Sequence, residues 1–320
     1  MLTIDFWNVA QGDCTVLTLP DGRLIMVDVG PPDSPVFDWL VDHPTLHVAK
    51  LLLTHNDDDH CGCLNAILEE FHPRVGSVHF LVDRAPAELR RLGFFRTMLR
   101  LHTARKLCVS RLEVRDEAML LWSSADGAHD LVLLFPDCIG NVSSTSPNRA
   151  SALFCLRAHG TPLVVWPGDS PLRQVATHLR GLGRPYFLMG PHHGAPEDRK
   201  QKGFAASVAA VAPQRGFLSL GTDGRAGNTY GHPCAGYIRA LLANGCRVVC
   251  SQITEKCDRK RAISGRHVMN TTALYGLPAP AGVYCRGHLR VVVDGGTMTM
   301  DEHDSEHLHR VSELHRPLCL

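Results

Sequence analysis

The stretch His55-Asn56-Asp57-Asp58-Asp59-His60 decides the fold and the chemistry that this sequence predicts. It follows the apolar run at residues 48–53, which is typical of a strand buried on both faces. Apolar side chains then recur at helical spacing over residues 64–71, so we expect the polar stretch on a strand-to-helix loop. Its histidines and carboxylates are suited to holding one or two metal ions. The alternative is an acidic surface turn, in which Asp and Asn are common.

Two further apolar runs end in the same way. The run at residues 163–166 leads to Gly168-Asp169, and the run at residues 186–189 leads to His192-His193. In α/β proteins, sites are built at the carboxyl ends of the strands. We therefore expect Asp and His side chains from three strands to meet at one place.

The rest of the chain indicates a single mixed domain. Alternating residues near the start predict an antiparallel meander, and β-rich and helical patterns continue to about residue 293. Neither an internal repeat nor a Pro-, Gly- or Ser-rich linker divides the sequence. We predict one α/β domain over residues 1–298, followed by a His-rich C-terminal tail at residues 299–320. We expect its histidines to lie on a solvated tail or a frayed helix rather than in a metal site, at positions His303, His307, His309 and His315.

Composition excludes several classes of protein. The chain has 320 residues, of which 44% are hydrophobic and 20% charged, which argues against disorder and fibrous repeats. No apolar run approaches the roughly 20 residues that a membrane span requires. The first residues lack the basic and apolar segments of a secretory signal, so we expect a cytoplasmic protein with reduced cysteines. The formal net charge of +1 gives no global attraction to nucleic acid or membranes.

The motifs resemble a known family. The loop at residues 55–60 resembles the His-x-His-x-Asp-His signature of the metallo-β-lactamase fold, and Val27-Asp28-Val29-Gly30 resembles the Asp-x-Gly turn that precedes it. Further motifs occur in the order seen in the hydrolase domain of the DNA-uptake protein ComEC and its stand-alone soluble relatives, at residues 8–13, 148–151, 168–169, 191–194 and 231–233. The resemblance covers about residues 1–255. It implies a four-layer αββα sandwich with one or two divalent metal ions at the sheet edges.

The resemblance also implies roles for individual residues. The metal ligands would be His55, Asp57, Asp59, His60, Asp169 and His193. His192 is the alternative to His193 as ligand, and is otherwise a phosphate contact. Asp28 would orient the ligand loop by hydrogen bonding. The catalytic residues would be Asp59, Asp169, His192 and His232, with His232 facing the substrate to stabilise developing charge or protonate a leaving group. The alternative for His232 is a side chain fixed by a tight Gly-Pro turn.

Departures from the signature leave the metal open. Asp57 stands in place of its second histidine, and this hard oxygen ligand makes Mn²⁺ or Mg²⁺ plausible beside Zn²⁺. Many members of the family also have a histidine between the loop motif and the Gly-Asp motif, and this sequence has no clear match to it. His129 and His159 are candidates, and the alternative is that Asn148–Ser151 takes that place. There are two interpretations of Cys61 and Cys63. One places a thiolate near the metal, and the other treats both as small buried apolar residues.

The predicted function is a metal-dependent hydrolase, foremost a phosphodiesterase or nuclease that uses a metal-bound hydroxide. Between Arg84 and Arg115 nine Lys or Arg face two Asp or Glu, and a second basic cluster comprises Lys256, Arg259, Lys260 and Arg261. These clusters steer nucleic acid toward the site or form an exposed basic helix face. The alternatives are an ester, thioester or lactone hydrolase, and a catalytically degenerate protein that binds a partner in a bacterial multi-protein system. The sequence identifies no such partner.

Overall fold

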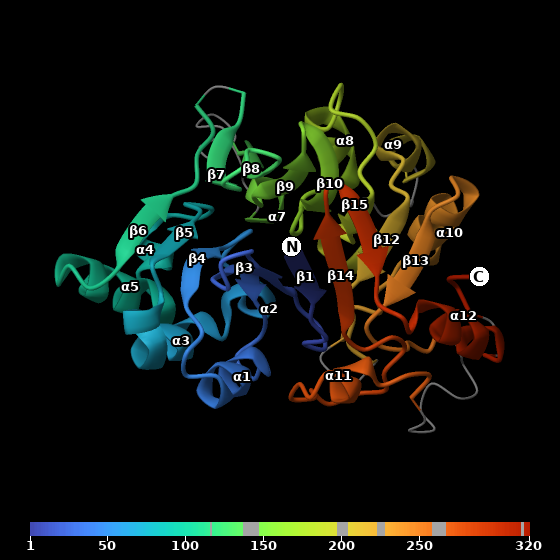
Figure 1. Ribbon diagram of the computed structural model, residues 1–320, viewed down its shortest axis with the longest axis horizontal. Helices are drawn as coiled ribbons and strands as arrows, with labels where there is room; N and C mark the ends of the chain where they lie inside the picture. The colour runs from blue at the N-terminus through green and yellow to red at the C-terminus, as the bar shows by residue number, and fades with distance from the viewer. Residues whose placement is uncertain (116, 137–146, 197–203, 223–227, 258–266, 315–316) are drawn as a thin grey trace.

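The computed structural model describes residues 1–115, 117–136, 147–196, 204–222, 228–257, 267–314 and 317–320. In this part of the chain the strands form two sheets (Figure 1). The first runs, in spatial order, β15 (Thr297–Met300), β14 (Leu289–Asp294), β1 (Leu2–Phe6), β2 (Cys14–Thr18), β3 (Leu24–Val29), β4 (Val48–Leu52), β5 (Ser77–Phe80), β6 (Cys108–Arg111). The second runs β13 (Arg247–Cys250), β12 (Arg215–Leu218), β11 (Phe187–Met189), β10 (Thr161–Trp166), β9 (Leu153–Ala158), β8 (His129–Phe135), β7 (Met119–Ser123).

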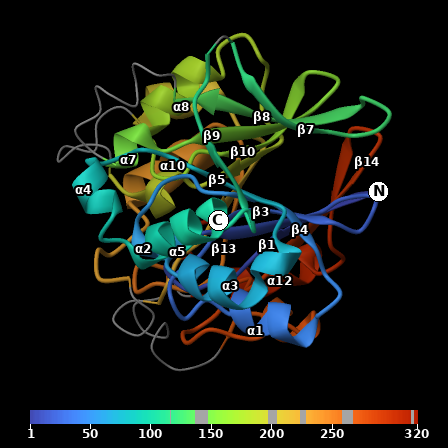
Figure 2. The same ribbon diagram turned by 90° about the vertical axis from the view of Figure 1, so that its left-hand side faces the viewer.

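Helices cover the outer face of each sheet. The first sheet is covered by α1 (Val36–Asp42), α3 (Leu64–Phe71) and α5 (Gly93–Thr103), and the second by α8 (Leu172–His178), α9 (Phe204–Val211) and α10 (Ala235–Ala243). Figure 2 shows the layers from top to bottom, with α8 above β8 to β10, and α3 and α1 below β1, β3 and β4. The predicted αββα sandwich is confirmed. The shorter helices are α2 (Asp58–Cys61), α4 (Pro86–Leu89), α7 (Pro147–Ala150), α11 (Thr271–Leu274) and α12 (Asp304–Ser312).

Strand β3 explains why the central strands are apolar on both faces. Ile25 and Val27 belong to the core between the two sheets, whereas Leu24 and Met26 belong to the core beneath α1 and α3. Because successive strand side chains point to opposite faces, a strand covered on both sides needs an unbroken apolar run. Each sheet therefore packs against helices on one face and against the other sheet on its second face.

Aromatic rings close the core between the sheets. Phe6 of β1 stacks on Phe187 of β11 with ring centroids 4.7 Å apart, and it is fully buried. We predict that Phe6→Ala lowers the free energy of unfolding by about 3–5 kcal/mol, because it removes apolar contacts and leaves a cavity. Urea denaturation measures this loss. The exposed Leu120→Ala serves as control, and equal effects of the two changes would contradict the assignment.

The parallel strands place the polar loops together. β3, β4 and β5 are parallel in the first sheet, and β10, β11 and β12 are parallel in the second. The loop at residues 55–60 follows β4, Asp169 follows β10, and His193 follows β11. All three therefore lie at carboxyl ends of strands, where both sheets open to the same edge.

The C-terminal segment differs from the tail expected at residues 299–320. Helix α12 buries His307 and Val311, one helical turn apart, and Val311 belongs to the core beneath the second sheet. Asp304 forms an ion pair with Arg247 of β13, with Nη1 and Oδ2 2.8 Å apart. His307 lies on the buried face because it shares the i, i+4 stripe with Val311. His315 lies outside the described residues.

Candidate metal centre

The ligand loop is held by Asp28, at the end of β3. Its carboxylate accepts from the backbone N–H of Thr54 at 2.8 Å and from the Thr54 hydroxyl at 2.7 Å. The same carboxylate lies 2.9 Å from Nδ1 of His60. Because a proton on Nδ1 satisfies this bond, the other ring nitrogen, Nε2, is left free to bind a cation. Asp28 thus lies where the sequence predicts a residue that orients the loop.

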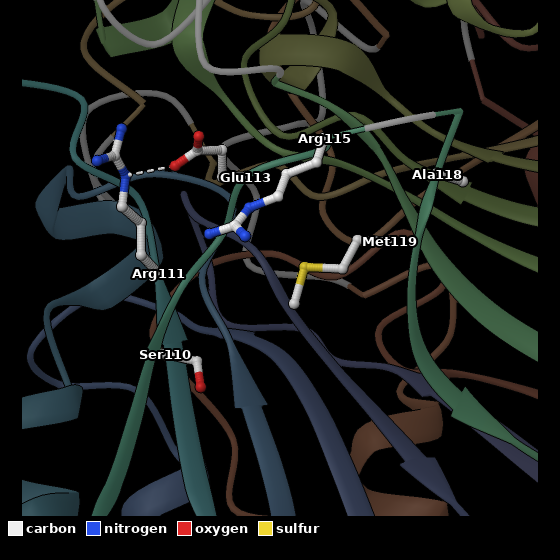
Figure 3. Close-up of a pocket in the computed structure, with 6 residues that line it drawn as sticks. All are labelled: Ser110, Arg111, Glu113, Arg115, Ala118 and Met119. Atoms are coloured by element: carbon white, nitrogen blue, oxygen red, sulfur yellow. Dashed lines mark ion pairs between the residues drawn. The ribbon is translucent and has the colours of Figure 1, made fainter.

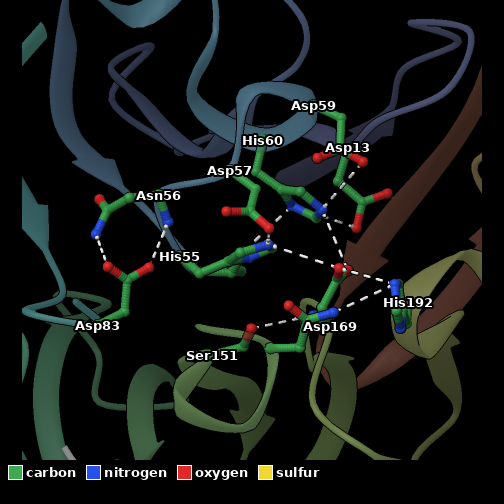
Figure 4. Close-up of polar contacts among 12 residues, drawn as sticks. Asp13, His55, Asn56, Asp57, Asp59, His60, Asp83, Ser151, Asp169 and His192 are labelled. Carbon is green, nitrogen blue, oxygen red and sulfur yellow. Dashed lines mark hydrogen bonds and ion pairs between the residues drawn. The ribbon is translucent and has the colours of Figure 1, made fainter. Parts of the chain in front are cut away.

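Side chains from the loops that follow β4, β10 and β11 lie close to His60 (Figure 4). Its Nε2 lies 3.2 Å from Oδ1 of Asp169 and 3.9 Å from Oδ2 of Asp59. Nε2 of His193 lies 3.2 Å from Oδ2 of Asp59. His55 joins the group through Nε2, which is 3.6 Å from Oδ2 of Asp169. Ligand-capable atoms from separate parts of the chain therefore converge on one small volume.

Several of these atoms are buried without a hydrogen-bond partner. Within the described residues this holds for Nε2 of His55, Nε2 of His60 and Oδ1 of Asp169, although they lie close to one another. Orphaned buried polar atoms are costly, and a cation among them would satisfy all three. Sets of imidazoles and carboxylates suit Zn²⁺ and Mn²⁺. The residues present fit a divalent ion.

The charges in the cluster also favour a cation. Burial alone would lower the pKa of His60, but the carboxylates of Asp59, Asp169 and Asp28 outweigh burial and raise that pKa well above its usual range. Burial would likewise raise the pKa of Asp169, yet His55 and His60 bring it well below its usual range. The carboxylates therefore favour positive charge at His60, which a bound cation would also supply.

Metal binding should depend on pH for this reason. A ligand imidazole must lose its proton to bind metal, and the raised pKa values of His60 and His193 keep protons on these rings at neutral pH in the metal-free protein. We predict that Zn²⁺ binding releases protons at pH 7 and weakens by about tenfold per pH unit for each proton released as the pH falls. Calorimetry in buffers of different ionisation enthalpy measures both quantities. Affinity that stays constant from pH 8 to pH 6 would contradict a histidine-containing site.

The two adjacent histidines after β11 are oriented differently. His193 is buried, and its Nδ1 lies 3.0 Å from the backbone carbonyl oxygen of Ser219, which leaves Nε2 directed at Asp59. His192 is 39% exposed at its side chain, and its Nε2 lies 3.3 Å from Oδ2 of Asp169. Both residues have positive φ, at 47° and 52°, a strained conformation for side-chain-bearing residues that is found at functional sites. The geometry favours His193 as ligand and leaves His192 facing the open side.

His232 and Asn148 complete the open side. The turn carrying His232 is fixed by Asn228, whose side chain bonds both the backbone N–H and the carbonyl of His232. Burial, together with His193 and His192, lowers the pKa of His232 to about 4, so its ring is neutral at pH 7. The side-chain amide nitrogen of Asn148 lies 3.3 Å from Nε2 of His192.

The family follows from comparison with known proteins. The model of the metallo-beta-lactamase superfamily matches residues 7–195, more than half of the chain. The chain belongs to this superfamily.

Solved structures with a similar course of the chain share little sequence with it. YhfI from Bacillus subtilis, a metallo-beta-lactamase fold protein, is 11% identical, with a TM-score of 0.45 over 78% of this chain and 95% of that one. Igni18, a metallo hydrolase from the archaeon Ignicoccus hospitalis, is 15% identical, with a TM-score of 0.46 over 78% and 94%. The short form of human tRNase Z is 16% identical, with a TM-score of 0.41 over 69% and 92%. Comparison with curated proteins found no match.

Sequence patterns did not indicate the roles of two residues at the site of this superfamily member, Asp13 and Arg84. Asp13 is buried, with Oδ1 3.4 Å from Nδ1 of His193, although no role was assigned to it within the motif at residues 8–13. Gly12, with a φ of 143°, lets that motif approach so closely that an added Cβ would lie 2.3 Å from the carbonyl oxygen of Asp59. Arg84 donates from Nη2 to Oδ1 of Asp57 at 2.7 Å. It was predicted only as part of a basic cluster.

Other predicted residues lie away from the centre. His129 pairs with Ala158, whereas Phe135 pairs with Leu153, so His129 and the neighbouring His159 lie at the far ends of β8 and β9. Asn148, from the other candidate segment, contacts His192 at the centre. Cys61 and Cys63 are buried, and burial raises the pKa of Cys63 to about 12, which argues against a thiolate ligand.

The basic clusters divide between several surfaces. Arg84 lies at the centre, whereas Arg111 and Arg115 line a separate cavity of about 630 Å³ between β6 and β7 (Figure 3). Lys256 donates to the backbone carbonyls of Gly231 and Pro233, beside His232. The remainder of its cluster, Arg259, Lys260 and Arg261, lies outside the described residues.

The centre opens into a large cleft. A cavity of about 990 Å³ is lined by Asp57, Arg84, Asp169, His192, His232 and Tyr230. Tyr230 is 79% exposed and stacks on His232 with ring centroids 5.8 Å apart and ring planes 18° apart. A smaller cavity of about 180 Å³ adjoins it, with Pro171, Leu172, Phe204 and Tyr237 among its walls. Among the described residues, no helix combines the length and apolar character needed to cross a membrane.

Proposed function

We propose that this superfamily member is a metal-dependent phosphodiesterase with nucleic acid as its substrate class. The observation that carries the proposal is the convergence of unpaired buried ligand atoms on His60 and Asp169 at the floor of an open cleft. Arg84 and the imidazoles of His192 and His232 face the same cleft, which suits an anionic substrate. The order of motifs resembling the ComEC hydrolase domain supports the same substrate class.

The residues divide the chemistry between them. His55, Asp59, His60, Asp169 and His193 would hold one or two divalent ions, of Zn²⁺ or Mn²⁺ and less readily Mg²⁺. Such an ion, when bound, polarises a phosphoryl oxygen and lowers the pKa of water from 15.7 to about 7. Asp169 lies where its carboxylate can orient an attacking water, since it reaches both His60 and His192. His232, neutral at pH 7, can donate a hydrogen bond to a phosphoryl or leaving-group oxygen.

Tyr230 supports a nucleotide rather than a simple phosphate ester. Its ring lies flat against His232, leaving the opposite face open at the mouth of the cleft. Aromatic rings that stack a base contribute about 1–3 kcal/mol per base. A nucleobase on Tyr230 would place its phosphate toward His232 and the metal centre.

A screen of substrates tests the proposal. Purified protein is incubated with single- and double-stranded DNA, RNA and bis-p-nitrophenyl phosphate, each with Zn²⁺, Mn²⁺ or Mg²⁺. We expect metal-dependent cleavage that a chelator abolishes and that added metal restores. Absence of cleavage from every substrate with every metal would reject the proposal.

The smaller cavity favours a second candidate function. Its apolar walls next to Asp169 and His192 would accept an acyl chain, as in an ester, thioester or lactone hydrolase of the same fold. The same screen, extended to p-nitrophenyl esters and thioesters, separates the two activities. Turnover of acyl esters with inert phosphodiesters would favour the second candidate. Inactivity toward both classes, together with retained structure, would favour a partner-binding protein in a bacterial, cytoplasmic multi-protein system.

A further inference from the structure

Asp57, which replaces the second histidine of the signature, is turned toward a guanidinium. Nη2 of Arg84 donates to Oδ1 of Asp57 at 2.7 Å, and Nε of Arg84 donates to Oδ1 of Asp83 at 3.0 Å. Asp83 is itself fixed, since it accepts from the backbone N–H and the side-chain amide of Asn56 at 2.9 Å and 2.7 Å. The two carboxylates therefore hold Arg84 against the rim of the centre instead of letting it extend into solvent.

In the described part of the chain, the groups of ligand-capable side chains around His60 do not include Asp57. Among the described residues, three triads of side chains could hold a metal ion; each contains His60 and none contains Asp57. The side-chain amide of Asn148 contacts His192. A cation near His60 would have Asp59, Asp169 and His193 as further ligands, whereas Asp57 is already paired with Arg84.

We propose that the centre binds a single divalent cation on the His60 side and that Arg84 takes the place of a second one. Arg84 pairs with Oδ1 of Asp57 and, through Nη1, binds a phosphoryl oxygen of the substrate. Nη1 has no hydrogen-bond partner among the described residues, and Arg84 lines the cleft together with Asp169 and His192. A guanidinium stays charged at all relevant pH values and donates in a fixed planar geometry that matches phosphate. The phosphoryl contact rests on the proposed function, whereas the number of metal ions does not.

Removal of Arg84 would change the ligands that are available to a second cation. Oδ2 of Asp57 lies 3.6 Å from Nε2 of His55, which lies 3.6 Å from Oδ2 of Asp169. Freed of its ion pair, Asp57 would form a second ligand set with these two side chains. Arg84 thus disfavours a second cation, because its positive charge already pairs with Oδ1 of the carboxylate that such a cation would need.

Counting bound ions tests the proposal without any turnover. Calorimetry with Zn²⁺, followed by elemental analysis after desalting, should give one ion per chain in the wild type, even in excess metal. Arg84→Met should bind a second ion in excess metal, and the double variant Arg84→Met/Asp57→Asn should return to one. Two ions in the wild type, or no second ion in Arg84→Met, would overturn the exclusion of a second cation.

Binding of inorganic phosphate tests the role of Nη1. With one equivalent of Zn²⁺ bound, phosphate affinity should fall about tenfold in Arg84→Met and recover only in part in Arg84→Lys, which keeps the charge but lacks the planar donor geometry of the guanidinium. Arg90→Met, at an exposed position that does not line the cleft, is the control, and thermal unfolding establishes that each variant folds. Unchanged phosphate affinity in folded Arg84→Met would overturn the phosphoryl contact. Failure to cleave any phosphodiester would reject the proposed function but leave both binding results interpretable.

Discussion

Asp169→Asn is expected to lower phosphodiester turnover by on the order of 10³-fold, because a metal ion contributes several kcal/mol of charge stabilisation to the transition state. The substitution keeps the size of the side chain but removes the negative charge that both His60 and His55 approach. Metal affinity should fall with the activity. Steady-state kinetics and calorimetry on the same preparation measure the two effects.

Asp130→Asn is the matched control for this prediction. Asp130 is a partly buried carboxylate of the same sheet, but it pairs with Arg157 at the end of β8 remote from the centre. Its replacement should leave metal binding and turnover near wild type. If Asp169→Asn retains full metal affinity and turnover, the assignment of Asp169 as a ligand is wrong.

Arg286→Leu is expected to reduce the free energy of unfolding by about 3–5 kcal/mol, because it leaves a buried carboxylate without its partner. Arg286 is fully buried and donates to Asp301 and to the sulfur of Met269. All three residues follow the stretch that matches the superfamily model, at residues 7–195. The prediction therefore tests whether the C-terminal part of the chain is integral to the domain.

A surface ion pair provides the comparison. Arg310 pairs with Glu306 on α12, and both side chains are about half exposed, so Arg310→Leu should cost less than 1 kcal/mol. Urea denaturation of the two variants measures the difference. The double variant Arg286→Leu/Asp301→Leu should recover part of the loss, since it removes the unpaired charge. Equal destabilisation by Arg286→Leu and Arg310→Leu would contradict the buried pair.

The sequence was informative where a side chain follows a buried strand. The run before His55, and the runs before Asp169 and His193, each specify a strand whose carboxyl end must lie at the sheet edge, so their meeting could be predicted. His192 and His193 could not be separated, because their roles depend on the positive φ values that turn the two rings in different directions. That conformation has no signature in a His-His pair.

Arg84, Asp13 and His307 were beyond the reach of sequence patterns. Arg84 is one of nine basic residues between positions 84 and 115, and only its tertiary contact with Asp57 and Asp83 distinguishes it from the others. Asp13 reaches His193 because Gly12 permits a close approach to Asp59. His307 is a polar residue type on a helix with few apolar positions, so burial of α12 against the core was not indicated.

We propose that His60, Asp169 and His193 together bind a divalent cation. X-ray diffraction from crystals grown with Zn²⁺, recorded at energies on either side of the zinc absorption edge, locates such an ion directly. We expect an anomalous peak bounded by Nε2 of His60, Nε2 of His193 and the carboxylate of Asp169. Zinc bound elsewhere on the chain, with no peak between these three side chains, would contradict it.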